Sequence, residues 1–249
     1  MINAIMYPDI KKHIAETNSV FKEYVSFLDK DSQKSEDKKG WLHSSAKRLM
    51  DVAYILNGVG FKDNWNILEL GARGSAFGVF LTGKVNSVIV SDSFQIGQNK
   101  GHTWYSFDKP APYGDLEKWG RRWIDICDNK EKLLCAEVGC RIIPFEEEKF
   151  DCVFALSVIE HIKNQDGDTA QEDLRALQEM ERVVKIGGIV AITTDFSKKD
   201  VCARNRARRY TEESILNLIS KTNLELTTDW YDYNADNDCS GCLILRRIR

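Results

Sequence analysis

Short apolar runs and segments of helical periodicity alternate along this chain. Runs rich in leucine and β-branched residues are typical of buried strands, and three stand out at 67–70, 88–90 and 189–193. The first run leads directly into a glycine loop, and the second ends in Ser91 and Asp92. The pattern therefore predicts buried strands whose carboxyl ends carry glycine or acidic residues.

Spacings of three and four residues between apolar positions predict helices in the C-terminal half. Apolar residues at 174, 177, 180, 183 and 184 predict a helix over 174–185. Thr169 and Glu172 have the spacing of a capping box in front of this helix, and Gly187-Gly188 would end it. A further helix is expected after Thr211, with Ile215, Leu218 and Ile219 on one face.

The N-terminal part of the chain is predicted to be helical. Apolar residues between 10 and 28 predict one helix, residues 29–40 form a charged linker rich in Ser and Lys, and apolar residues between 46 and 56 predict a second helix. Two arrangements fit this pattern: the helices cover the functional site as a cap, or they pack against the edge of the sheet. We assign residues 1–60 to this helical cap and linker.

The glycine loop after the first strand predicts a nucleotide-cofactor site. Gly71 and Gly74 supply unusual backbone angles and a surface without side chains, so a ligand can approach the main chain. Glu69, a carboxylate near the end of a core strand, needs a partner, which a cofactor hydroxyl or ammonium would provide. The spacing Gly71-x-x-Gly74-x-x-x-Gly78 lacks the pyrophosphate fingerprint, which disfavours a nicotinamide-dependent oxidoreductase. Asp92 follows about 20 residues later, where an acid typically accepts ribose hydroxyls.

Several ordered motifs resemble those of class I S-adenosylmethionine-dependent methyltransferases, and in particular the small-molecule type 11 group. They are the glycine loop at 69–74, the region 142–162 with its Ser-Val-Ile-Glu-His-Ile sequence, the element at 179–193, and Arg209-Tyr210-Thr211. The resemblance spans about residues 64–249. The chain departs from the family pattern where Arg73 stands in place of a common glycine, where Ser75 takes the third glycine-like position, and where Ile186 replaces a proline.

This resemblance implies an α/β fold that is Rossmann-like and doubly wound, with a mostly parallel sheet, an antiparallel C-terminal strand and a helical N-terminal cap. It implies that residues 61–249 form a domain that binds S-adenosyl-L-methionine and carries an insertion at about 94–133. The expected cofactor-binding residues are Glu69, Gly71, Arg73, Gly74, Asp92, Ser93 and Ser157.

Composition and charge indicate the expected binding partners and cellular location of this domain. The 249 residues carry a net charge of −3, which gives no general attraction to nucleic acid or to anionic membranes. The N-terminus lacks the pattern of a secretion signal and no apolar run is long enough for a membrane span, so a cytoplasmic protein is expected. We interpret the seven cysteines as reduced, and Cys239-x-x-Cys242 lacks the companion ligands of a zinc site.

Aromatic and basic residues bear on the methyl acceptor. The aromatic side chains of the insertion suit contact with sugars or aromatic metabolites, or else a small satellite core. Basic residues at 204–209 and 246–249 could hold a phosphate-bearing substrate, or else be solvated surface. The sequence Ala155-Leu156-Ser157-Val158 differs from the motif of methyltransferases that act on nucleic-acid bases or glutamine. The insertion residues concerned are His102, Trp104, Tyr105, Phe107, Tyr113, Trp119 and Trp123.

These features favour O-methylation of a sugar hydroxyl in glycan biosynthesis. The alternatives are a methyltransferase for another small metabolite or lipid, and a non-catalytic scaffold protein that binds the cofactor. Arg73 and the altered glycine loop are the features that support the scaffold.

A hydroxyl acceptor needs a base that removes its proton. His161 is the first candidate, because imidazole titrates near neutrality and this residue follows the expected fourth strand; the alternative is a packed structural histidine. Asp195 follows the fifth strand and is the second candidate, alone or with a neighbouring acid on a divalent ion. No ligand spacing demands a metal. His102 and His43 are held in reserve.

Overall fold

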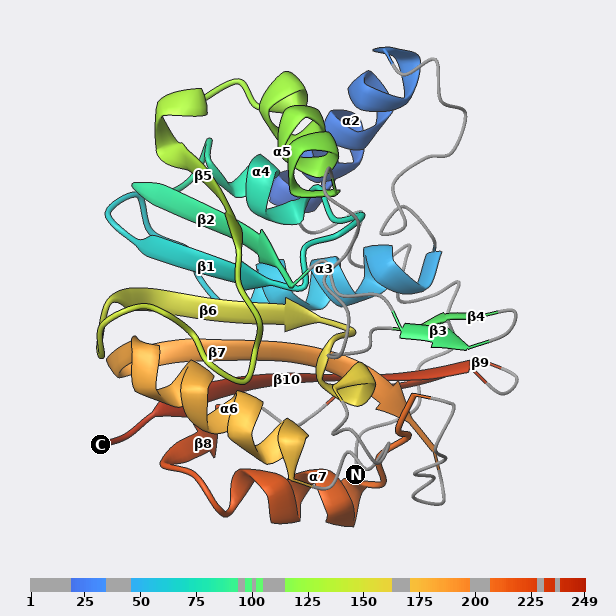
Figure 1. The fold of residues 1–249 in the computed structure, drawn as a ribbon, viewed down its shortest axis with the longest axis vertical. Coiled ribbons are helices and arrows are strands. Elements are labelled where there is room, and N and C mark those ends of the chain that lie inside the picture. The colour runs from blue at the N-terminus through green and yellow to red at the C-terminus, as the bar shows by residue number, and fades with distance from the viewer. Residues whose placement is uncertain are drawn as a thin grey trace.

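A mixed sheet of eight strands forms the centre of the protein (Figure 1). The computed structural model describes residues 19–34, 46–93, 97–99, 102–104, 115–162, 171–197, 207–227, 231–235 and 238–249. The strands of the sheet are β1 (Asn66–Leu70), β2 (Ser87–Asp92), β5 (Leu133–Glu137), β6 (Phe150–Leu156), β7 (Val184–Phe196), β8 (Leu224–Leu226), β9 (Tyr231–Ala235) and β10 (Asp238–Arg247). They lie in the order β5-β2-β1-β6-β7-β10-β8, and β9 pairs with β10 beside this path.

Neighbouring strands are parallel through most of the sheet, and the C-terminal strand reverses. β5, β2, β1, β6 and β7 run in one direction, whereas β10 is antiparallel to β7, β8 and β9. From β1 the order runs one way to β2 and β5 and the other way to β6 and β7, so β1 and β6 flank a topological switch point. The predicted doubly wound, mostly parallel sheet with an antiparallel C-terminal strand is confirmed.

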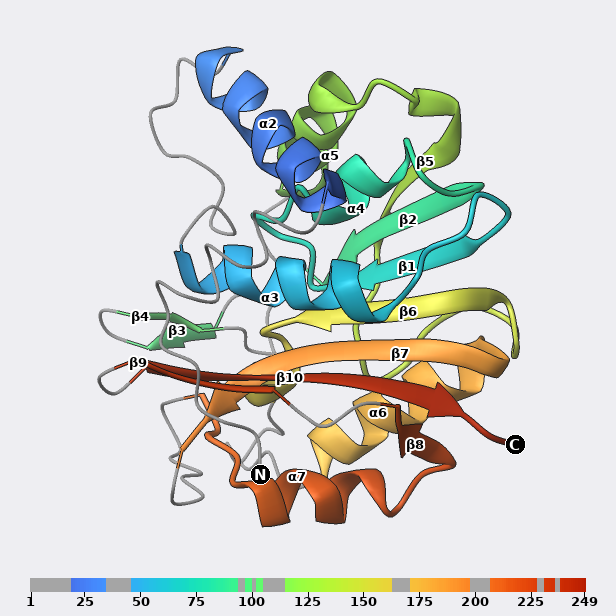
Figure 2. The same ribbon diagram turned by 180° about the vertical axis from the view of Figure 1, so that it is seen from behind.

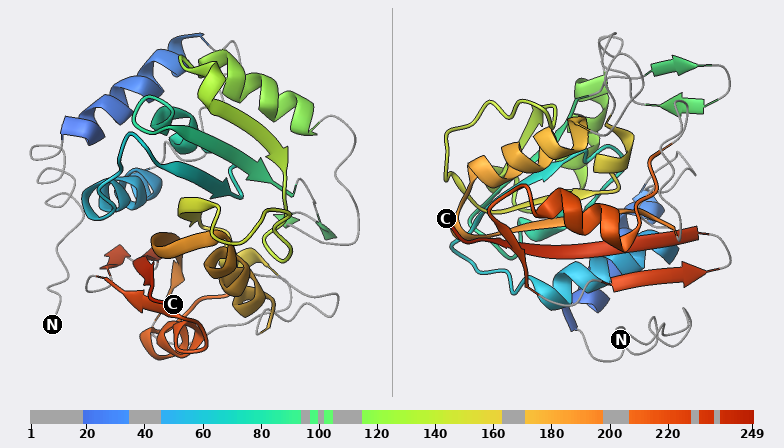
Figure 3. Two further views of the ribbon diagram at one scale, coloured as in Figure 1. Left: turned by 90° about the vertical axis from the view of Figure 1, so that its left-hand side faces the viewer. Right: turned by 90° about the horizontal axis from the view of Figure 1, so that it is seen from below.

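Helices cover both faces of this sheet (Figures 1 and 2). One face shares a hydrophobic core with α2 (Ser19–Lys34), α3 (Ala46–Gly58), α4 (Phe77–Leu81) and α5 (Asp115–Ile126). The other face is covered by α6 (Glu172–Val183) and α7 (Glu212–Ile219). Figure 3 shows the twist of the sheet between these two layers. Two 3-10 turns, η2 (Lys130–Lys132) and η3 (Ile159–His161), and a separate hairpin of β3 (Gly97–Asn99) and β4 (His102–Trp104) complete the described elements.

The N-terminal helices belong to the same core as the sheet. Tyr24 of α2 is fully buried, and its ring meets the ring of Phe77 edge-on with centroids 5.6 Å apart. Helix α3 approaches β10 so closely that a Cβ on Gly58 would lie 2.1 Å from Ile244 Cδ1. Of the two arrangements considered from the sequence, packing against the sheet describes these contacts. Helix α2 continues to Lys34, so the start of the predicted linker at residue 29 was wrong.

Helix α6 follows the predicted periodicity, but its ends differ from the prediction. The helix begins at Glu172, and the side chain of its N-cap residue, Gln171, makes no capping bond. Glu172 is therefore the first helical residue and not the third, the position that a capping box with Thr169 requires. Thr169 itself is outside the described part of the chain. The helix ends at Val183, ahead of the two glycines, because β7 already starts at Val184. The capping box occurs instead at α7, between Thr211 and Ser214.

Candidate functional site

The loop after β1 turns sharply at the carboxyl edge of the sheet. Gly71 and Gly74 have φ angles of 65° and 78°, in the left-handed region that favours glycine. A Cβ on Gly71 would lie 2.4 Å from Val158 Cγ2, so the loop after β6 packs directly on this turn. Val158 thereby brings the predicted cofactor loop and the predicted catalytic loop into contact.

The end of β2 holds this loop in place. The amide of Ala72 donates to the carbonyl of Ser91 at 2.8 Å, and the amide of Arg73 donates to Asp92 Oδ2 at 3.2 Å. Asp92 is 1% exposed, so its carboxylate supports the loop as well as being the candidate ribose ligand. Ser93 is half-buried and faces Gly139 in the segment after β5.

Glu69 lies beneath the loop with a partner inside the protein. Its Oε2 accepts a hydrogen bond from the amide of Gly78 at 2.8 Å, in the first turn of α4. Burial raises the pKa of this carboxyl to about 7, although the bonds from Ser75 and Gly78 act in the opposite direction. The sequence predicted that a cofactor group would satisfy Glu69; the structure supplies a helix amide for one oxygen, and direct contact with the cofactor stays a prediction.

A buried carboxylate also organises the loop after β6. Glu160 is 0% exposed; its Oε1 bonds the hydroxyl of Ser157, and its Oε2 accepts from Thr194 Oγ1 at 3.3 Å. Ser157 itself has a φ of 55°, which is unusual for a residue with a side chain. His161 Nε2 lies 3.9 Å from Glu160 Oε1, and the His161 side chain is 22% exposed. The sequence identified Ser157 and His161 but overlooked Glu160, although an acid inside an otherwise apolar run was a usable signal.

A second buried cluster fixes the end of β7. The carbonyl of Asp195 accepts from the amide of Tyr210 at 3.0 Å, and the hydroxyl of Tyr210 donates to Asp173 Oδ2 at 2.8 Å. Arg208 forms an ion pair with the same oxygen at 2.6 Å, and its amide donates to the carbonyl of Glu160 at 2.8 Å. Burial raises the pKa of the Asp173 carboxyl, while Tyr210 and Arg208 counteract it. Asp195 is therefore positioned through its backbone, beside the loop that carries His161.

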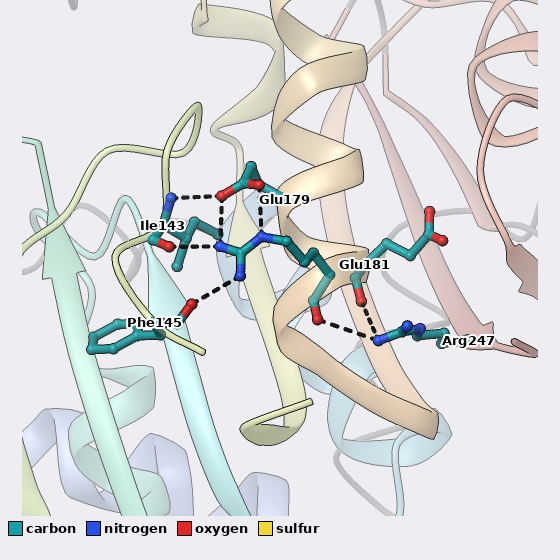
Figure 4. A network of polar contacts seen from close by, with 6 residues as sticks. Ile143, Phe145, Glu179, Glu181 and Arg247 are labelled. Carbon is teal, nitrogen blue, oxygen red and sulfur yellow. Dashed lines mark hydrogen bonds and ion pairs between the residues drawn. The ribbon is translucent and has the colours of Figure 1, made fainter. Parts of the chain in front are cut away.

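The segment before β6 is tied to α6 by an arginine (Figure 4). Arg182 donates to the carbonyls of Ile143 at 2.7 Å and Phe145 at 2.9 Å. It also makes a two-point pair with Glu179, whose Oε2 accepts from the amide of Ile143 at 2.8 Å. The hydrogen bonds with Arg182 are the largest cause of the lowered pKa of Glu179. These contacts give the start of the motif region 142–162 a structural role, because they join the loop before β6 to α6.

Several residues considered for substrate contact have structural roles. Trp123 is fully buried, and its indole Nε1 donates to the carbonyl of Ser75 at 3.0 Å. Trp123 belongs to the main hydrophobic core on the α2–α5 face of the sheet and not to a separate satellite core. Arg208, from the first basic cluster, pairs with Asp173. Arg247, from the terminal cluster, donates to the carbonyls of Glu181 and Arg182 at the end of α6 (Figure 4). It also donates to the carbonyl of Val184.

Other predicted residues lie beyond the described side chains. His43, Tyr105, Phe107, Tyr113 and the basic residues 204–206 are outside the described part of the chain, and the side chains of His102, Trp104 and Trp119 are as well. Among the described residues, no group of three or more His, Cys, Asp or Glu is placed to hold a metal ion. Cys242 is buried and its thiol contacts Asp51 Oδ1 at 3.4 Å. No described helix is both long and apolar enough to cross a membrane.

Comparison with known families identifies this arrangement. A family model described as a methyltransferase domain matches residues 123–192, from the buried end of α5 to the middle of β7. The chain carries a methyltransferase domain. This methyltransferase uses S-adenosylmethionine as its cofactor. No curated protein matches the sequence.

Solved structures show that the methyltransferase has the class I fold. A protein from Bacillus halodurans superimposes with a TM-score of 0.59 at 13% identity, over 80% of this chain and 99% of that one. The 1,6-didemethyltoxoflavin-N1-methyltransferase of Burkholderia thailandensis gives 0.56 at 14% identity, over 92% and 88%. The geranyl diphosphate C-methyltransferase of Streptomyces coelicolor gives 0.58 at 9% identity, over 82% of each chain.

The carboxyl edge of the sheet fits this cofactor. The turn at Gly71 and Gly74 places main chain without side chains at the end of β1, and Asp92 provides a carboxylate at the end of the adjacent strand. S-adenosylmethionine has a charged amino-acid end and a ribose with two hydroxyls. The glycine turn suits the close approach of the amino-acid end, and the Asp92 carboxylate suits the ribose hydroxyls.

Proposed function

We propose that this methyltransferase acts on a small molecule and transfers the methyl group to a hydroxyl, specifically a sugar hydroxyl in glycan assembly. The observation that supports a hydroxyl acceptor is the pairing of His161 with the buried carboxylate of Glu160 after the end of β6. His161 Nε2 lies 3.9 Å from Glu160 Oε1. An imidazole next to a buried carboxylate has the composition of a general base and its orienting group.

In this proposal, separate residues bind the cofactor and deprotonate the acceptor. Bound S-adenosylmethionine supplies an electrophilic methyl group on its sulfonium sulfur. Gly71, Gly74 and Asp92 hold and orient the cofactor, while His161 takes the proton of the acceptor hydroxyl as the C–O bond forms and the C–S bond breaks. Glu160 orients the imidazole and stabilises its protonated form. Asp195, from the neighbouring strand, is the second candidate base.

Support for the sugar itself is compositional. It rests on the aromatic residues of the insertion and the basic residues near β7, of which Trp123 and Arg208 have structural partners. These structural partners reduce the support for a sugar and leave a second candidate, in which the acceptor is another small metabolite or a lipid. Two proteins of the same fold are named for acceptors of this kind, a toxoflavin precursor and geranyl diphosphate.

An acceptor screen with labelled S-adenosylmethionine tests both candidates. We expect labelled product with nucleotide sugars or glycans in preference to aromatic metabolites or prenyl diphosphates. His161→Ala should lower kcat by about 10²–10⁴-fold, because a general base is lost. Glu160→Gln should lower kcat less and move the pH profile, because the imidazole loses its orienting charge.

Calorimetry with S-adenosylhomocysteine provides the control for this screen. His161→Ala should retain the affinity of the native protein, whereas Asp92→Ala should weaken it roughly 10-fold or more, the loss expected for a charge-assisted hydrogen bond. Product formed only with non-sugar acceptors would replace the first candidate by the second. An unchanged kcat in His161→Ala would rule out this residue as the base.

A further inference from the structure

Two buried polar atoms on the α4 side of β1 have no hydrogen-bond partner among the residues that the structure describes. They are the hydroxyl oxygen of Tyr24, in α2, and Oε1 of Glu69, in β1. The two residues are 0% and 1% exposed. A buried polar atom without a partner is costly, and two such atoms in one region point to an enclosed water that bonds both.

Helix α4 places the two groups in the same region. The ring of Tyr24 packs edge-on against Phe77 and Phe80, with centroid distances of 5.6 and 5.2 Å. Between these two residues, the amide of Gly78 donates to Glu69 Oε2 at 2.8 Å. Burial, followed by the negative charge of Glu69, raises the pKa of the Tyr24 hydroxyl, so the phenol lies within electrostatic reach of the carboxylate.

We propose that the hydroxyl of Tyr24 is linked to Glu69 Oε1 through one buried water that accepts from the phenol and donates to the carboxylate, and that Tyr24 is thereby a positioning group for the cofactor loop. The inference rests on the proposed role of the loop at Gly71 and Gly74 in holding the cofactor. It assigns to the N-terminal helix a polar link to the floor of the cofactor site that the sequence patterns did not reveal.

The link reaches the cofactor loop through Glu69. The loop runs from the end of β1 to α4, and Glu69 joins these two ends, because it lies in β1 and holds the amide of Gly78. The carboxylate has little room to move, since a Cβ on Gly78 would lie 2.3 Å from its Oε2. Docking of α2 and binding of the cofactor are then reciprocally coupled, because each favours the same position of Glu69.

The surroundings of Glu69 make this link sensitive to pH. Its neighbours are Val90 of β2, Phe154 of β6, the amide of Gly78, the hydroxyl of Ser75 and, from α2, the phenol of Tyr24. Among these neighbours, the phenol is the one titratable group. Burial raises the pKa of Glu69 to about 7. The protein therefore loses stability as pH rises from the unfolded pKa near 4.5 through about 7, and a donor at Oε1 limits that loss.

Unfolding in urea tests the pairing in the protein without cofactor. Tyr24→Phe should lower the free energy of unfolding more at pH 8.5 than at pH 5.5, because the lost bond is stronger to an ionised carboxylate. In the Glu69→Gln background this pH dependence of the Tyr24→Phe effect should disappear. Phe27→Leu is the matched control: it loosens the contact of α2 with Phe80, at 5.8 Å between centroids, without removing a polar atom. Equal effects of Tyr24→Phe at both pH values would overturn the pairing.

Calorimetry with S-adenosylhomocysteine at pH 8.5 tests the positioning role. Tyr24→Phe should raise Kd roughly 3- to 10-fold, the value of one hydrogen bond, and Phe27→Leu should not. An unchanged Kd beside a confirmed pairing would overturn the positioning role alone. A native protein that binds no S-adenosylhomocysteine would overturn the cofactor assignment, while the urea data would still decide the pairing.

Discussion

At the scale of single residues, glycine is required at position 71 for two separable reasons. Its φ of 65° is strained for any residue with a side chain, and a Cβ would meet Val158 at 2.4 Å. Gly187 shares only the first property, with a φ of 80° and open space around it. A comparison of substitutions at Gly71 and Gly187 therefore separates the cost of the backbone conformation from the cost of the steric contact.

Gly71→Ala should cost about 2–5 kcal/mol of unfolding free energy, the sum of the left-handed penalty and of overpacking. Gly187→Ala should cost about 1–2 kcal/mol, because only the backbone is strained. Urea denaturation measures both values, and calorimetry should show weaker binding of S-adenosylhomocysteine in Gly71→Ala alone. Equal costs would mean that the loop moves away from Val158 freely.

At the scale of elements, α6 is held at both ends by arginines from elsewhere in the chain. Near its N-terminus, Asp173 is bound by Arg208 and Tyr210, which links α6 to the segment after β7. At its C-terminus, Arg247 of β10 donates to three carbonyls, the arrangement that a helix end with unpaired acceptors favours. Arg208 and Arg247, two of the basic residues that suggested phosphate binding, thus hold the ends of the helix.

Arg247→Ala should lower the free energy of unfolding by about 2 kcal/mol, since it removes charged hydrogen bonds to partly buried carbonyls. Arg246→Ala is the control. Arg246 is exposed, and its one described side-chain hydrogen bond goes to the carbonyl of Gly187. Urea denaturation measures both changes. Neither variant should alter cofactor affinity, and a loss of cofactor affinity in Arg247→Ala would contradict a purely structural role for Arg247.

At the scale of the whole molecule, the N-terminal helices complete one face of the sheet. Their buried side chains contribute about 1.5–3 kcal/mol each, which is roughly 10–20 kcal/mol together and as large as the 5–15 kcal/mol by which a domain is usually stable. The buried residues concerned are Phe21, Tyr24, Leu28, Val52, Ile55, Leu56 and Val59. The predicted division at residue 60 therefore separates parts that share one core.

A fragment of residues 61–249 should fail to fold cooperatively, because α4 and the sheet would lose this cover. Near-UV circular dichroism and urea denaturation would show no defined transition. A chain that begins at Ser19 is the control: it keeps every described contact and should unfold in one step. A stable, cofactor-binding fragment 61–249 would instead establish two independent units.

The sequence by itself determined several strands and helices of the core and the positions where a cofactor could meet them, but it did not predict α5, which lies within the expected insertion. Apolar periodicity located β1, β2 and α6, because side-chain burial repeats with the geometry of each element. The glycine spacing and Asp92 located the carboxyl edge of the sheet, since these residues are set by local backbone conformation and by chemistry. The end of α6 could not be located in this way, because the strand that follows begins before the glycines.

Only the tertiary structure decided which polar residues pair with one another. Glu69 meets Gly78, Glu160 meets Thr194, and Asp173 meets Arg208 across different elements, and no local pattern encodes such contacts. The aromatic and basic residues illustrate the same limit, because Trp123 and Arg247 have the chemistry of ligand contacts but lie where the fold needs a core side chain and a helix cap. Burial and partner choice depend on distances between elements, which the sequence specifies only through the folded chain.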